Sequence, residues 1–61
     1  MEMHFVTSPL IKAIGYDKDS RILEIEFHTN EILIYSEISF DLYVAFMSSP
    51  SKAEFWRQYI K

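Results

Sequence analysis

The feature that most constrains the fold is an alternation of apolar and polar side chains in the segment from Arg21 to His28. The apolar positions are Leu23, Ile25 and Phe27, and the polar positions are Glu24, Glu26 and His28. Successive side chains of a β-strand point to opposite faces of a sheet, so this period of two predicts a strand with one buried and one solvent-exposed face. Such a strand needs neighbours to pair with and a layer to cover its buried face.

Two further segments have the composition of strands. The apolar run 10–17 ends in a polar cluster that reaches residue 20, which predicts a strand followed by a turn. Residues 32–35 are rich in β-forming side chains and follow a short polar connection, in which Asn30 can adopt the left-handed backbone conformation. Together with the alternating segment, these two segments predict an antiparallel meander of three strands.

After Ser39 the spacing of apolar residues changes to that of a helix. Leu42 and Phe46 lie four residues apart, which places them on the same side of a helix. The Ser39 hydroxyl can accept a hydrogen bond from a free amide of the first turn. We therefore predict a helix over residues 40–47, which ends before Pro50 because proline cannot continue it.

A second helix is predicted from residue 52 to residue 59 or 60. Residues 51–54 match a capping box, in which the Ser51 hydroxyl and the Glu54 carboxylate each bind a free amide of the first turn. The predicted class is therefore α+β, a three-stranded antiparallel β-meander followed by two short C-terminal helices (β-β-β-α-α).

The two helices are expected to cover the buried face of the meander in a single domain over residues 1–61. With only 61 residues the chain has room for one core. The expected core residues are Ile14, Leu23, Ile25, Phe27, Leu33 or Ile34, Leu42, Phe46 and Phe55.

Composition excludes several classes of function. The chain has no cysteine, so disulfides and thiolate metal sites are absent, and a reducing cytoplasm is the expected location. No apolar run reaches membrane-spanning length and no export signal is recognisable, so we expect no membrane partner. The formal net charge of −3 also disfavours a dedicated nucleic-acid binder, which usually carries a basic excess.

The order of several short motifs resembles a known family, the KTSC domain. The motifs are Ser8 and Ile11 ahead of Ile14-Gly15-Tyr16-Asp17, then Leu23-x-Ile25-x-Phe27, and a close formed by Ser51, Lys52, Trp56, Ile60 and Lys61. The KTSC domain is a module of about this length, found alone in bacterial and phage proteins and at the C-terminus of some lysyl-tRNA synthetases. The resemblance spans nearly the whole chain, and the synthetase context implies an association with RNA.

The chain departs from the KTSC pattern at four places. Leu33 replaces the first aromatic residue of a central Tyr-x-Tyr, so only Tyr35 of that pair remains. Asn30 replaces a turn glycine, Ala53 replaces the glycine after Ser-Lys, and Ile38-Ser39 replaces Val-Pro. The loss of one central aromatic ring weakens the expectation of RNA binding, because stacking on bases needs exposed rings.

Catalytic and metal sites are not expected. Glu24, Glu26 and His28 could line one strand face as ligands or acid–base groups, but a solvated strand face has the same pattern, and a zinc site needs three or four converging ligands. Gly15 is the only glycine, which excludes a glycine-rich phosphate loop, and there is no Gly-x-Ser-x-Gly motif. We therefore predict no enzyme, no metal and no cofactor.

Basic and aromatic side chains combine in a candidate nucleic-acid-binding site. Its residues are Lys12, Tyr35, Lys52, Trp56, Arg57 and Lys61. Positive charge beside aromatic rings is the composition that holds single-stranded nucleic acid. In the alternative interpretation, Trp56 packs in the core, and the basic side chains are exposed to solvent on the outer side of the last helix.

Two functions follow from these observations. The first is an RNA-associated accessory module of KTSC type. The second is a protein-interaction module or small regulator, acting through self-association as a homodimer or through an acidic, aromatic surface, because ten aromatic residues exceed what so small a core can hide. The orientation of Trp56 and Tyr35 is the observation that bears most directly on the choice.

Overall fold

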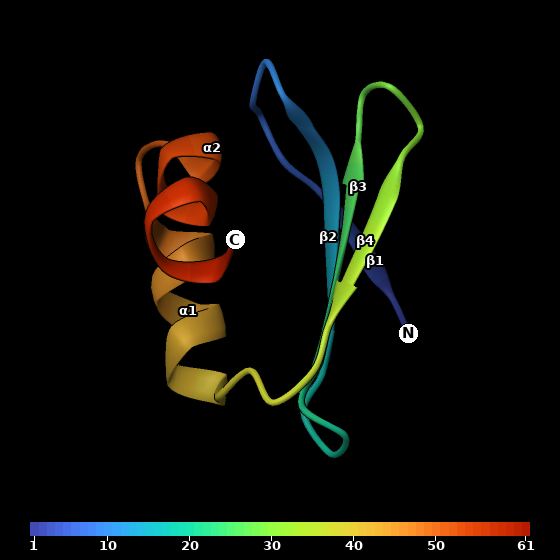
Figure 1. Cartoon of the computed structure of the whole chain (residues 1–61), viewed down its shortest axis with the longest axis vertical. Helices are drawn as coiled ribbons and strands as arrows, with labels where there is room; N and C mark the ends of the chain where they lie inside the picture. Colours follow the sequence, from blue (N-terminus) through green and yellow to red (C-terminus); the bar gives the residue numbers. More distant parts are fainter.

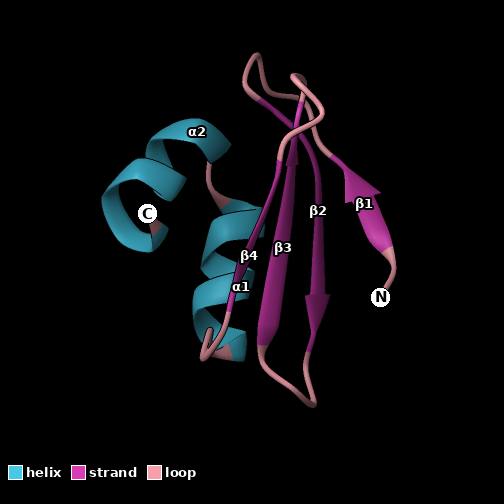
Figure 2. Cartoon of the chain, turned by 45° about the vertical axis from the view of Figure 1, so that its right-hand side comes forward, coloured by secondary structure: helices cyan, strands magenta, loops and turns pink.

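Four strands form one antiparallel sheet. The computed structural model describes every residue from Met1 to Lys61. The strands are β1 (Met3–Phe5), β2 (Ile11–Asp17), β3 (Ile22–Phe27) and β4 (Ile32–Tyr35). Each strand pairs antiparallel with the next, in the order β1-β2-β3-β4, so that β1 and β4 are the two edges (Figure 2). The α+β class and the meander of β2, β3 and β4 are confirmed.

The prediction of three strands was wrong by one, because it missed β1. This strand pairs with β2 through Met3 opposite Gly15 and Phe5 opposite Ala13. A Cβ on Gly15 would contact the Met3 sulfur and lie 3.1 Å from the carbonyl oxygen of Glu2. The missing side chain therefore lets the N-terminal segment approach β2 closely. Three residues are too few to show a period of two, so no sequence pattern marks this strand.

Helices lie against one face of the sheet, and the opposite face carries none (Figure 1). The helical segments are α1 (Phe40–Ser48), α2 (Lys52–Phe55) and the π-helical turn η1 (Trp56–Ile60) that continues α2. Ser39 caps α1 by accepting a hydrogen bond from the Leu42 amide at 3.1 Å, as predicted. No helix is long and apolar enough to cross a membrane.

The predicted capping box of the second helix is only half formed. The Ser51 hydroxyl accepts a hydrogen bond from the Glu54 amide at 3.3 Å. The Glu54 carboxylate, however, turns along the helix surface, where it accepts a hydrogen bond from Gln58 at 3.2 Å and lies 3.7 Å from the guanidinium of Arg57. The Glu54 carboxylate therefore binds side chains of the next turn, and not the backbone amide that the capping-box motif predicts.

The core lies between the sheet and the helices. Five residues of the predicted core are fully or almost fully buried: Ile14, Leu23, Ile25, Phe27 and Phe46. The alternative left open in β4 is settled, because Leu33 packs against this cluster while Ile34 is exposed. Leu42 and Phe55 are partly buried at its margin. The structure adds Ile11, Ala13, Ile38, Ala53 and Trp56 to the buried set.

Candidate functional site

Trp56 and Tyr35 point toward the core. Trp56 is only 8% exposed, and its ring meets the ring of Phe27 edge-on, with 5.0 Å between the centroids. The indole Nε1 donates a hydrogen bond to the Tyr35 hydroxyl at 3.1 Å. Tyr35 itself lies on the helix-facing side of β4, because it pairs with the buried Leu23. Both rings therefore join the sheet to the last helix, and the Trp56 ring offers no open platform for a base.

The basic residues of the candidate site do not form one patch. Lys12 lies on the other side of the sheet, where its ammonium is 3.8 Å from the Glu26 carboxylate. Lys52 donates a hydrogen bond to the carbonyl oxygen of Ser49 at 2.6 Å. Arg57 is paired with Glu54, as described above. These three cations are each engaged with an oxygen of the chain itself.

Only one cation of the candidate site lies beside a ring. The Lys61 ammonium is 5.2 Å from the centroid of the Trp56 ring, within the range of a cation–π interaction. The structure thus brings together Tyr35, Trp56 and Lys61, and it separates them from Lys12.

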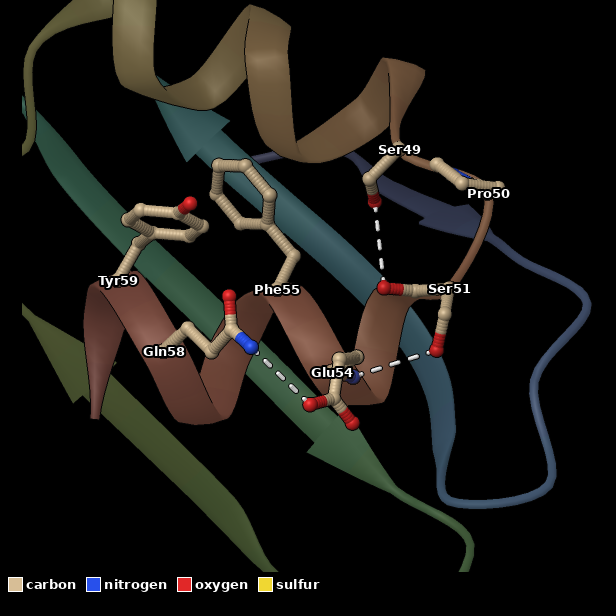
Figure 3. A pocket seen from close by; sticks show the side chains of 7 residues that line it. All are labelled: Ser49, Pro50, Ser51, Glu54, Phe55, Gln58 and Tyr59. Atoms are coloured by element: carbon tan, nitrogen blue, oxygen red, sulfur yellow. Dashed lines mark hydrogen bonds between the residues drawn. The ribbon is translucent and has the colours of Figure 1, made fainter.

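A shallow pocket lies between the end of α1 and the last helix (Figure 3). It is lined by Ser49, Pro50, Ser51, Glu54, Phe55, Gln58 and Tyr59. Its volume is about 170 Å³, whereas small-molecule sites usually measure about 300–1,000 Å³. The Ser49 and Ser51 hydroxyls and the Glu54 carboxylate are all engaged in hydrogen bonds at the helix start. The polar lining therefore serves the local fold.

The three groups considered as metal ligands do not converge. Glu24 and Glu26 lie on β3, on the side away from the helices, because they alternate with the buried Leu23, Ile25 and Phe27. His28 follows the strand, and its Nε2 is 2.8 Å from the carbonyl oxygen of Ser8. No group of three or more His, Asp or Glu side chains is close enough to hold a metal ion.

The side of the sheet without helices is the most distinctive surface of the chain, and we call it the helix-free face. Its residues form two rows across the four strands, Phe5-Ala13-Glu26-Ile32 and Met3-Gly15-Glu24-Ile34. Phe5 is 78% exposed, Ile34 64% and Ile32 50%. Apolar side chains therefore occupy both edges of this face, and Glu24 and the ion pair of Lys12 with Glu26 lie at its centre.

Sequence reasoning missed the apolar part of the helix-free face. One signal was available in β4, where apolar residues occupy both alternating sets of positions, Ile32 and Ile34 on one side and Leu33 and Tyr35 on the other. β4 lies at an edge of the sheet, and the helices cover only one of its faces. One of its two alternating sets of apolar side chains must therefore be exposed. No comparable signal marks Phe5, because β1 itself was not predicted.

Several residues that carry the KTSC resemblance hold the fold together. The Tyr16 hydroxyl donates a hydrogen bond to the Ile38 carbonyl at 2.6 Å, and its ring stacks on Tyr43 with 4.5 Å between the centroids. The Ser8 hydroxyl accepts hydrogen bonds from the amides of Leu10 and Ile11, both at 3.2 Å. Tyr16 thus joins β2 to α1, and Ser8 shapes the entry into β2.

Asp17 shapes the turn after β2, and this gives a pH-dependent prediction. A hydrogen bond from the Ser20 side chain, followed by one from the Asp19 amide at 3.0 Å, holds the pKa of Asp17 below its ordinary value of 3.8. A lowered pKa means that the unfolded chain takes up the proton first, so the stabilising effect of Asp17 is present above pH 3.8 and is lost as the pH falls through the lowered pKa.

An NMR titration of the Asp17 carboxyl carbon measures that pKa directly. Replacing Asp17 by Asn should remove its share of the acid dependence of stability, whereas Asp19→Asn, which keeps the backbone donor, serves as the control. A pKa for Asp17 at or above the ordinary value would contradict this role in the turn.

The fold and the candidate site define a class of protein: a small α+β domain with one face of its sheet covered by helices and the other open. The family model of the KTSC domain matches residues 7–61, so the chain belongs to the KTSC domain family. The crystal structure of a KTSC domain protein from Yersinia pestis is similar, with a TM-score of 0.95 and 37% sequence identity over 98% of this chain and 84% of that chain. No curated protein matches the sequence.

Proposed function

We propose that this KTSC domain is a non-catalytic protein-interaction module that binds its partner with the helix-free face. The single observation that carries this proposal is the exposure of Phe5, Ile32 and Ile34 on one face. Single exposed apolar side chains are ordinary, but three large ones along the two edges of one open sheet face offer a partner two apolar contacts on the same surface. Full burial of each such side chain under a partner would contribute about 1.5–3 kcal/mol.

The charges of the helix-free face select a basic partner. Glu24 and Glu26 lie between the two apolar edges, and Lys12 lies on the same face, 3.8 Å from Glu26. Glu24 is therefore the carboxylate of this face that is left for a partner, and the whole chain carries a net charge of −3. Lys or Arg side chains on the partner would meet this carboxylate, and the partner's apolar side chains would meet Phe5 and Ile34. A second copy stacked face to face would instead bring together two faces of the same net negative charge. The proposed partner is therefore a protein segment that is both basic and apolar.

A selection experiment tests this proposal. A random-peptide display library is panned against the immobilised domain, and we expect enriched peptides that combine basic and apolar residues. The double variant Phe5→Ser/Glu24→Gln should weaken binding of a selected peptide at least about tenfold, since one buried apolar side chain and one charge contact are lost. Binding is measured by fluorescence polarisation with the labelled peptide.

The matched control is Tyr59→Ser/Glu54→Gln, which makes the same kinds of change on the helical side of the molecule. Tyr59 is 63% exposed, so this variant should fold and should bind the peptide like the unchanged chain. Equal loss of binding in both double variants, or selected peptides without basic residues, would contradict the proposal.

RNA association is the second candidate function, and the contact of Lys61 with the Trp56 ring is the observation that favours it. Polarisation of labelled single-stranded RNA and of tRNA, at low and at physiological salt, tests it. RNA binding that is lost in Lys61→Gln but kept in Phe5→Ser/Glu24→Gln would replace the protein-interaction proposal. No RNA binding at either salt concentration would remove this second candidate.

A further inference from the structure

The free edge of β4 carries unpaired backbone groups. The Phe27 amide donates to the Glu31 carbonyl at 2.9 Å, which fixes the alternation of hydrogen bonds between β3 and β4. In an antiparallel pair every second residue bonds across the pair, so Leu33 and Tyr35 bond to β3. The N–H and C=O groups of Ile32 and Ile34 therefore point away from the sheet at its edge.

The edge of β4, although only four residues long, has no lysine, proline or β-bulge to prevent pairing with another strand. Proteins normally protect an edge with lysine, proline, a β-bulge or a very short strand. β4 contains Ile32-Leu33-Ile34-Tyr35, and its pairing with β3 is regular. The opposite edge strand, β1, has only three residues (Figure 2). Of the two edges, β4 is therefore the better template for a further strand.

We infer that β4 pairs antiparallel with β4 of a second copy of this chain, around a two-fold axis at Leu33. In this register Ile32 lies opposite the partner's Ile34, and Ile34 lies opposite the partner's Ile32. The outward backbone groups of both residues then form four hydrogen bonds across the edge. The exposed isoleucines meet as apolar cross-strand pairs, which stabilise antiparallel strands.

The charges around β4 favour this register over its neighbours. With Leu33 on the axis, Glu31 lies opposite the partner's Tyr35, and no like charges face each other. A slip of two residues in one direction places Glu31 opposite the partner's Glu37. A slip in the other direction places Ile34 opposite the partner's Asn30 and reduces the two isoleucine pairs to one, between Ile32 and the partner's Ile32. The strand is thus self-complementary around Leu33.

Edge pairing keeps the glutamates of the two copies farther apart than face-to-face stacking would. In the edge-paired dimer the two β3 strands are three strand spacings apart, about 14 Å. That distance exceeds the Debye length of about 8 Å at physiological salt, so Glu24 and Glu26 repel their counterparts little. The pairing does not depend on the proposed function, but it would join two helix-free faces into one face of eight strands.

Analytical ultracentrifugation tests the inference. The average mass of the unchanged chain should rise toward that of two chains as its concentration increases from micromolar to millimolar. Ile34→Lys, which places a charge opposite the partner's Ile32, should raise the dissociation constant about tenfold or more. Phe5→Lys is the matched control, because it introduces the same residue at an exposed apolar position of the other edge strand. Its average mass should rise with concentration in the same way as that of the original chain.

Cross-linking tests the register. The chain has no cysteine, so Ile32→Cys and Ile34→Cys can be made separately and mixed under oxidising conditions. Residues that form a hydrogen-bonded antiparallel pair have Cα atoms about 5.5 Å apart, within the range of a disulfide. The mixed dimer of the two variants should form in preference to either pure dimer.

The other outcomes overturn the inference in distinguishable ways. A dimer that Phe5→Lys breaks and Ile34→Lys spares would place the contact at β1. A monomer at all concentrations, with a selected peptide that Ile34→Lys releases but Phe5→Ser/Glu24→Gln still binds, would mean that the edge of β4 takes a partner's strand. A monomer that still binds the selected peptide through Phe5 and Glu24 would end the dimer inference and leave the proposed function intact.

Discussion

Replacing Phe46 by Ala should lower the free energy of unfolding by about 3–5 kcal/mol. Phe46 is fully buried on α1, and its ring stacks on Phe55 with 5.4 Å between the centroids. Alanine would leave a cavity at the contact between α1 and α2, where the small core has no spare residues to fill it. Because domains are stable by only about 5–15 kcal/mol and one of this size lies at the low end of that range, this variant should lose most of its stability. Urea denaturation followed by Trp56 fluorescence measures the change.

Phe5→Ala is the control for this prediction, since it removes the same ring from a position that is 78% exposed. Its effect on the free energy of unfolding should stay within about 0.5 kcal/mol, as for most surface substitutions. A Phe46→Ala variant as stable as Phe5→Ala would mean that α1 does not pack on the sheet as described.

The sequence was most informative where a repeating pattern extended over several residues. The alternation around Leu23, Ile25 and Phe27 correctly predicted β3 and its buried face. Ser39 correctly marked the start of α1 because a capping hydroxyl acts within one turn. The positive φ of 72° at Asn30 was likewise predictable from the residue type. These features depend on near neighbours in the chain, which a sequence pattern records.

The missed features depend on contacts between distant parts of the chain. β1 is held by its approach to Gly15, ten or more residues away, and nothing within Met3–Phe5 itself indicates a strand. The positions of Ile32 and Ile34 on an open face depend on where the helices lie, which no local pattern states. The helix-free face could therefore be recognised only after the sheet and its covering layer were placed together.

The orientation of the last helix shows the same limit. Phe55 with Tyr59, and Trp56 with Ile60, form two apolar rows of equal spacing, so periodicity alone cannot choose the inward one. The structure places Trp56 against Phe27 and Tyr35 of the sheet. Phe55 instead contacts Phe46 of α1. One apolar row of the last helix thus packs on the sheet and the other on α1. The Trp56 ring, which was proposed to stack on bases, is therefore part of the core.

Trp56→Ala should lower the free energy of unfolding by about 3–5 kcal/mol, nearly as much as Phe46→Ala. The variant removes the edge-on contact with Phe27 and the hydrogen bond to the Tyr35 hydroxyl, which together fasten η1 to the sheet. Trp56→Phe keeps an aromatic ring and loses mainly the indole donor, so we expect a loss of about 1 kcal/mol. Urea denaturation followed by far-UV circular dichroism suits both variants, because neither retains the tryptophan.

The two variants Trp56→Phe and Trp56→Ala distinguish a role of Trp56 in the core from a role in stacking on bases. If Trp56 acts through the core, stability should fall steeply from Trp to Phe to Ala, and Tyr35→Phe should cost little more once Trp56→Phe has removed the shared hydrogen bond. If the ring were an exposed platform, Trp56→Ala would leave the urea midpoint unchanged and would reduce only RNA binding. Because Trp56→Ala should also destabilise the fold, a loss of RNA binding in that variant alone would carry no information about the site. Lys61→Gln in the folded protein is the variant that tests it.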